Sequence, residues 1–190
     1  TPRRPLQITT FLLTSAAILV TPGPTNTILA ASGAAMGLRQ AKLLPLAEAL
    51  GYALAIGFFL SVASLLRDVS QALPAMKAMA AVWLLISARK LWSLPVVPEI
   101  PARSGAFARV LVTTLLNPKA MLVGTISIPS LLPDVPALGL LSFVALSALA
   151  GLGWTVLGAS LPTRLRRHSY RMAAMIVCGF AVAAAVSAAQ

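Results

Sequence analysis

The sequence predicts an all-α integral membrane protein with six transmembrane helices, in a single domain that covers residues 1–190. Hydrophobic residues make up 58% of the chain, and its mean hydropathy is +0.90. Only 10% of the residues are charged, whereas soluble domains are about 25% charged. Uncharged stretches such as 5–38 and 135–163 are long enough to cross a bilayer, which takes about 20 apolar residues.

The apolar runs place the helices at residues 6–32, 43–66, 73–92, 106–132, 137–161 and 172–189. The first run is too long for a signal peptide, and more apolar sequence follows its prolines, so we interpret it as a true span. The third run gives the least support for a span, because only eleven uncharged residues separate Lys77 from Arg89. Both cations must reach opposite interfaces if this helix spans the membrane.

The distribution of basic residues predicts the orientation. Ten Lys and Arg residues lie in or beside the loops after the first, third and fifth helices, and four lie on the other side. Because cytoplasmic loops carry the excess of Lys and Arg, we expect these three loops to be cytoplasmic and both termini to face outward. Arg3 and Arg4 argue mildly for the opposite orientation. The two halves of three helices fit a 3+3 inverted repeat.

Prolines interrupt two of the predicted spans. In the first helix, Pro22-Gly23-Pro24 removes backbone donors and loosens the chain, so the helix should break there. Thr25 and Asn26 then begin a second half-helix, whose positive dipole end suits a substrate carboxylate. The alternative is a kink that serves helix packing alone.

The fourth helix repeats this pattern at Asn117-Pro118-Lys119. Asn can cap a half-helix, and Pro fits the first position of one. Lys119 is a cation inside a span, with snorkelling to the cytoplasmic surface as the alternative. Further along, Pro129 predicts a second kink.

Glu48, near the start of the second helix, is one of four acidic residues in the chain. Counted along the helices, it lies at a depth similar to that of Asn26 and Lys119. Ionisable groups inside membranes are costly and usually paired, so we expect Glu48 to interact with Lys119 directly, through water or through substrate. The alternative is an interfacial carboxylate paired with Lys42. Tyr52, one turn after Glu48, is placed to share its proton network.

Trp154, among Gly151, Gly153 and Gly158 in the fifth helix, either lines the cavity or faces lipid. Pairs of small residues at helix-packing spacing also occur, for example Gly33 with Gly37 and Ser147 with Gly151.

These motifs resemble those of the LysE/RhtB family of amino-acid exporters. The resemblance covers essentially the whole chain and includes Pro22-Gly23-Pro24-Thr25-Asn26, Gly37-Leu38-Arg39, the helix with Glu48, Gly51, Tyr52 and Gly57, and Leu116-Asn117-Pro118-Lys119-Ala120. It implies export of an amino acid or related small metabolite across a bacterial inner membrane, driven by the proton-motive force. The family's usual Pro-Gln-Phe after the fourth helix is here Pro129-Ser130-Leu131, which leaves the substrate open.

The hypothesis that follows is a carrier in which Glu48 takes up and releases the coupling proton while a substrate carboxylate docks between the two helix breaks. The proposed substrate-binding residues are Pro22, Gly23, Pro24, Thr25, Asn26, Tyr52, Asn117, Pro118, Lys119 and Trp154. The expected partners are a small-molecule substrate, protons and the lipid bilayer, and a homo-oligomer is compatible with the sequence.

Other classes of function fit the sequence less well. A passive channel or a non-transport membrane scaffold remain alternatives. An enzyme is not expected, because Ser61, Ser64 and Ser127 lack a credible histidine or acid partner. One cysteine and one histidine give no basis for a metal site, and no cofactor is expected. The net charge of +11 comes from basic residues in the loops between apolar runs, so it does not indicate binding of nucleic acid.

Overall fold

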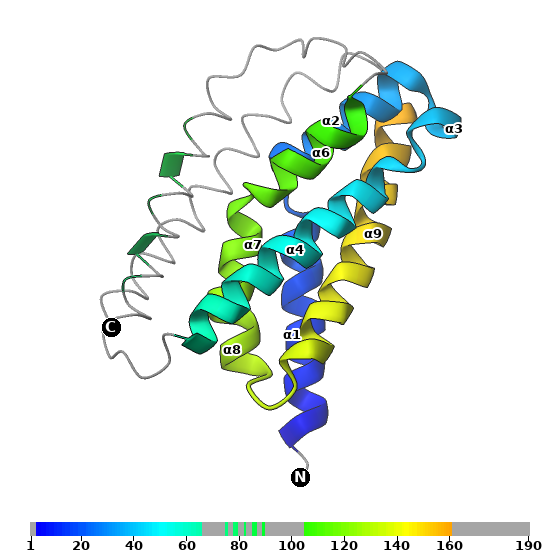
Figure 1. Ribbon diagram of the computed structural model, residues 1–190. Helices are drawn as coiled ribbons and strands as arrows, with labels where there is room; N and C mark the ends of the chain where they lie inside the picture. The colour runs from blue at the N-terminus through cyan, green and yellow to red at the C-terminus, as the bar shows by residue number, and fades with distance from the viewer. Residues whose placement is uncertain are drawn as a thin grey trace.

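The computed structural model describes residues 3–65 and 105–160, together with seven isolated positions between 75 and 89. Within these residues the regular secondary structure is entirely helical (Figure 1). The seven isolated positions fall in the predicted third helix, 73–92, and are helical. The rest of that helix and the predicted sixth helix, 172–189, lie outside the described residues.

The first predicted span consists of two helices, α1 (Arg3–Val20) and α2 (Pro24–Met36), which are bent by 57° relative to each other. The break falls at Pro22-Gly23, as predicted, because proline cannot continue the amide ladder. Gly23 is the extended N-cap of α2, and Pro24 occupies the first turn, where its missing N–H costs nothing. At the far end of α2, Gly37 has a φ of 74°, which is a conformation that favours glycine.

The second and fifth predicted spans are continuous helices. After the short α3 (Leu38–Ala41), α4 runs over Leu44–Leu65, within one residue of the predicted 43–66 at each end. The later helix α9 covers Pro136–Ser160, against the predicted 137–161. Both are apolar almost throughout, as helices in contact with lipid and with other helices are.

The fourth predicted span is interrupted twice. It begins with α6 (Ala106–Leu115), and after Leu116-Asn117 it resumes as α7 (Pro118–Leu122). A π-helical turn, η1 (Val123–Ser127), then leads into α8 (Ile128–Leu131). Pro129 accounts for this wide turn, since its ring cannot lie against the carbonyl four residues earlier.

Several of these helices are long and apolar enough to cross a membrane. Among the described residues, three stretches meet this condition, namely Leu38–Leu65, Ala106–Leu131 and Pro136–Ser160. The α1–α2 pair, taken as one bent span, gives a fourth. These findings indicate a membrane protein, and the count of six spans stays a prediction.

Helix α9 packs against both α2 and α4, and α4 packs against α6 (Figure 1). Glycines bring α2 and α9 together at two points. Gly158 lies directly against the backbone of Ala30, and Gly33 lies directly against the carbonyl of Thr155. Neither position leaves room for a Cβ atom, so close backbone approach defines this interface, as is common between helices in membranes.

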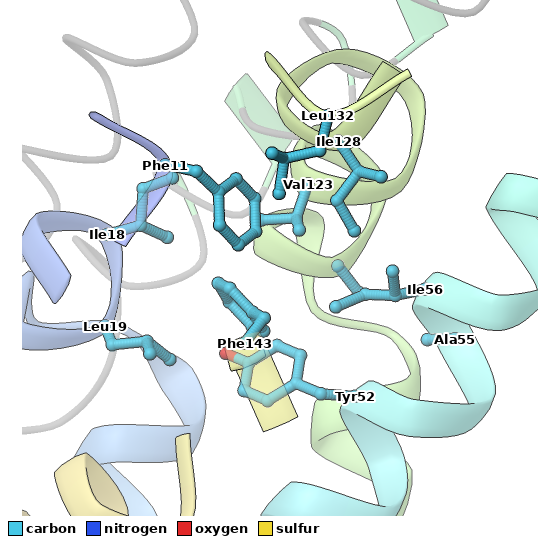
Figure 2. Close-up of a cluster of buried hydrophobic side chains, with 11 residues drawn as sticks. Phe11, Ile18, Leu19, Tyr52, Ala55, Ile56, Val123, Ile128, Leu132 and Phe143 are labelled. Carbon is cyan, nitrogen blue, oxygen red and sulfur yellow. The ribbon is translucent and has the colours of Figure 1, made fainter. Parts of the chain in front are cut away.

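Two apolar clusters fill the interior of the described bundle. The large cluster comprises Phe11, Ile18, Leu19, Tyr52, Ala55, Ile56, Ala120, Val123, Ile128, Leu132 and Phe143 (Figure 2). The small cluster, at the end of the bundle near α3, comprises Leu29, Ala41, Leu44, Ala47, Ala106 and Val110. Along α4 and α6–α7, the small cluster comes first and the large cluster comes last, with buried polar residues between them.

Candidate functional site

The buried polar residues between the two clusters form one layer, which we call the polar layer. Its members come from four segments of the chain and are Thr25, Asn26, Glu48, Tyr52, Thr114, Asn117 and Lys119. The two helix breaks meet in this layer, because Asn117 and Lys119 bond to residues beside Pro22-Gly23-Pro24. The sequence predicted a similar depth for Asn26, Glu48, Asn117 and Lys119, and the structure buries all four of them.

Asn117 connects the polar layer across three helices. Its side-chain oxygen accepts from the Lys119 amide at 3.0 Å and so caps α7, as predicted. Its amide nitrogen donates to Thr25 Oγ1 at 3.0 Å and to the Tyr52 hydroxyl at 3.3 Å. Thr114 Oγ1 lies 3.3 Å from Thr25 Oγ1, which adds a second link between α6 and α2. Both donors and the acceptor of the Asn117 side chain are therefore engaged.

The break between α1 and α2 frees carbonyls, and polar side chains satisfy them. Asn26 donates to Leu19 O at 2.8 Å and to Thr21 O at 2.9 Å. The half-buried indole of Trp154 donates to Leu19 O at 3.3 Å. Because backbone groups without partners are costly in lipid, these contacts stabilise the break. Trp154 therefore turns its polar edge toward the break.

Lys119 lies at the junction of the two broken helices. Its side chain is 6% exposed, and its ammonium donates to Thr21 O at 2.6 Å. This burial differs from the snorkelling alternative, in which the ammonium would reach the surface. Gly23 makes room for the side chain, since a Cβ there would lie 3.3 Å from Lys119 Cε. The position beside the C-terminal end of α1 is favourable for a cation.

Glu48 is buried with 1% exposure, and its Oε2 atom has no hydrogen-bond partner. It lies close enough to Lys119 for their charges to attract each other, although the Lys119 ammonium bonds to Thr21 instead. The exposed Lys42 does not hold this carboxyl group, so the structure differs from the interfacial pair that was the alternative. Among the described residues, the other buried side-chain oxygen without a partner is Ser32 Oγ.

Tyr52 forms the boundary between the polar layer and the large cluster. Its hydroxyl accepts from Asn117, while its ring packs edge-on against Phe143 with 5.2 Å between ring centroids (Figure 2). Its interaction with the Glu48 charge fits the predicted shared network, although no hydrogen bond joins the two residues.

Sequence reasoning missed two participants in this arrangement. Thr114 lies one turn before Asn117, and a hydroxyl at that spacing in an apolar helix was an available signal. Gly151 lies against the Glu48 carboxyl group, and nothing in the local sequence reveals which residue a glycine will face. Of the predicted residues, Pro22, Pro24 and Pro118 shape the breaks.

A crevice borders the polar layer at Asn117. Its volume is about 260 Å³, and its lining residues are Phe59, Met79, Leu115, Leu116, Asn117 and Met121. Pockets for drug-sized ligands are about 300–1,000 Å³, so this crevice suits a smaller solute. Among the described lining residues, Asn117 is the polar one.

Neither protein-family models nor curated proteins nor solved structures match this chain. The polar layer is therefore interpreted from its own geometry.

Proposed function

We propose that this protein is a secondary active exporter of the LysE/RhtB type, which moves an amino acid or related small metabolite across a bacterial inner membrane in exchange for protons. The observation that carries the proposal is the meeting of two broken helices at a buried lysine, with a buried carboxyl group nearby. Discontinuous helices whose broken ends meet inside the membrane are typical of the substrate sites of secondary transporters.

The junction has the groups that a substrate carboxylate needs. Thr21 O accepts one of the three N–H groups of the Lys119 ammonium, which leaves others to bind an anion. The N-terminus of α2 has no side-chain cap, so its first amides favour a negative charge. A carboxylate placed here would contact both, in competition with the Thr21 carbonyl.

The packing on either side of the polar layer supports a carrier rather than a passive channel. The large cluster lies on one side and the small cluster on the other. A permanently open pore would need a continuous polar path through both clusters. In a carrier, the helices that contribute to one cluster move apart while the other cluster stays packed, so the substrate reaches the polar layer from alternating sides.

Glu48 is the proposed proton carrier. A carboxyl group can hold the coupling proton in a buried site, and an intramembrane acid is a functional candidate by default. Ionised Glu48 would attract the ammonium group of an amino-acid substrate whose carboxylate is bound by Lys119, and protonation of Glu48 would remove that attraction. Proton binding and substrate binding would in this way exclude each other, as exchange of substrate for protons requires.

Transport into inside-out vesicles tests the proposal. Vesicles containing the protein receive a panel of radiolabelled amino acids, with and without an imposed proton gradient. We expect saturable, gradient-dependent uptake of one or a few compounds. In Glu48→Gln, which keeps the size of the side chain but cannot carry a proton, accumulation should fall to the level seen without a gradient.

Asp134→Asn is the matched control, because this acid is exposed in the turn before α9. It should accumulate substrate as the unmodified protein does. Gradient-driven accumulation at full level by Glu48→Gln would contradict the role of Glu48. Absence of uptake across the panel, with the protein present in the membrane, would contradict amino-acid export and favour a scaffold.

A further inference from the structure

The Glu48 carboxyl group occupies a space that exists because residue 151 is glycine. A Cβ atom built on Gly151 would overlap Glu48 Oε2. It would also lie 3.2 Å from Leu29 Cδ1 and 3.3 Å from Pro45 Cβ. The carboxyl group is therefore enclosed by α9 on one side and by apolar atoms of α2 and α4 on the others. We call this space the Gly151 seat.

The four glycines of α9 differ in what they face. Gly139 packs against Ile128 and Leu132 side chains, Gly158 packs against the Ala30 backbone, and Gly153 has open space. Within α9, Gly151 is the glycine that faces an ionisable group. Its role therefore includes more than the close backbone approach of α2 and α9 that Gly33 and Gly158 allow.

The chemistry of the Gly151 seat depends on the charge of its occupant. Glu48 Oε2 has no hydrogen-bond partner there, and burying an ionised carboxylate without partners is far more costly than burying a neutral carboxyl group. Among the described residues, Lys119 and Tyr52 are the charged or titratable groups that interact with Glu48. An ionised Glu48 would gain by leaving the seat for the ammonium of Lys119.

We infer that Gly151 is a positioning residue that seats the protonated Glu48 carboxyl group against α9, so that loss of the proton releases this contact between α4 and α9. The inference rests on the proposed function, because it gives the coupling proton a structural consequence. Protonated Glu48 joins α4 to α9 at the seat, and ionised Glu48 turns toward the junction of the broken helices. Gly151 thereby links the proton to the packing of the helix that also bears Trp154.

Infrared difference spectroscopy of the purified protein in lipid nanodiscs tests the seat without any substrate. In acidic buffer, the spectrum of the unmodified protein minus that of Glu48→Gln isolates the carbonyl stretch of protonated Glu48. A carboxyl group with few hydrogen bonds absorbs at a higher frequency than one in water, so we expect a high-frequency band. In Gly151→Ala, the band should shift to lower frequency, because the added methyl displaces the carboxyl group.

Gly153→Ala is the matched control on the same helix and should leave the band in place, since no described residue of another helix lies within 4 Å of a Cβ atom built at that position. Glu48→Asp provides the second test. Aspartate is one methylene shorter and leaves room for the methyl, so adding Gly151→Ala to Glu48→Asp should cause no further shift. If Gly151→Ala acted through a general packing defect, it would shift the carboxyl band by the same amount with glutamate or aspartate at position 48.

An unshifted band in Gly151→Ala would overturn the seat, as would a Glu48 band at the frequency of a hydrated carboxyl group, or no Glu48 band at all. These outcomes are distinct from failure of the transport proposal. A high-frequency band that shifts as expected, in a protein that transports nothing, would keep the seat and reject the exporter. Proton-coupled transport that Gly151→Ala leaves intact, together with an unshifted band, would keep the exporter and reject the seat.

Discussion

Single residues in the polar layer perform several tasks at once, and Asn117 is the clearest case. One oxygen caps α7, and one amide group reaches Thr25 on α2 and Tyr52 on α4. The cap is local to the chain, whereas the two donated hydrogen bonds join separate spans. Substitutions that differ in length can separate the two tasks.

Asn117→Ser should keep the cap but lose the hydrogen bonds to Thr25 and Tyr52. Serine caps helices about as well as asparagine but is too short to reach the neighbouring helices. Asn117→Ala should lose the cap as well as the two hydrogen bonds to the neighbouring helices, and loss of the cap should lower the free energy of unfolding by about 1 kcal/mol more. Hydrogen bonds between transmembrane helices contribute about 0.6 kcal/mol on average. The free energy of unfolding in mixed micelles measures both effects.

A double-mutant cycle with Thr25→Val isolates the bridge to α2. If Asn117 and Thr25 interact as the structure has them, the two substitutions should be non-additive by about 0.6 kcal/mol, and by no more than about 2 kcal/mol. Strict additivity would mean that this hydrogen bond contributes nothing to stability.

The sequence identifies most polar residues of the layer but not their partners. Thr25, Asn26, Glu48, Asn117 and Lys119 stand out because polar groups in apolar spans are rare. The partner of Lys119 is the Thr21 carbonyl, which becomes available only because the helix breaks and turns by 57°. A pattern of side chains contains no information about such a backbone acceptor. The sequence suggested an interaction with Glu48, whose charge does attract that of Lys119, but it did not reveal the hydrogen bond to Thr21.

At the scale of elements, the helix breaks are predictable and the helix contacts are not. Proline acts on its own turn, so Pro22, Pro24 and Pro118 locate both breaks from sequence. Contacts depend on which faces meet in three dimensions. Of the glycine pair Gly33 and Gly37, the first packs against α9, while the second has nothing within 4 Å and instead adopts a positive φ.

The contact of α2 with α9 gives a stability prediction. Gly158→Ala should destabilise the protein by about 1–3 kcal/mol, the usual cost of overpacking, because its methyl would collide with the backbone of Ala30. Gly57→Ala is the control, since no described residue of another helix lies within 4 Å of a Cβ atom built at that position and alanine favours a helix over glycine by up to about 1 kcal/mol. Urea or dodecyl sulfate titration of both variants measures the difference.

Equal stability of Gly158→Ala and the unmodified protein would show that the two helices can separate without cost. The close approach would then not be a fixed interface. The same titration on Gly33→Ala, which faces the Thr155 carbonyl, repeats the test at the second contact point.

At the scale of the whole molecule, the polar layer lies between two apolar clusters, and in the part of the chain that the structure describes the two ends carry different numbers of basic residues. Arg39, Lys42 and Arg109 belong to the end near α3, whereas Arg4 lies near the N-terminus at the other end (Figure 1). The positive-inside rule predicts from this asymmetry that the α3 end faces the cytoplasm. The turn between α8 and α9 is then predicted to face outward, with the N-terminus.

Cysteine labelling in intact cells checks this orientation. With Cys178 replaced by serine, single cysteines are introduced at Gln40 in α3 and at Asp134 in the turn before α9, both of which are exposed. A maleimide that cannot cross the membrane should label Asp134→Cys in intact cells and Gln40→Cys only after permeabilisation. The physical reason is that the two positions lie at opposite ends of the bundle (Figure 1), separated by helices long enough to span a bilayer. The reverse pattern would mean that the protein has the opposite orientation in the membrane, which would contradict the predicted topology. Labelling of both positions from one side would contradict a bundle that spans the membrane.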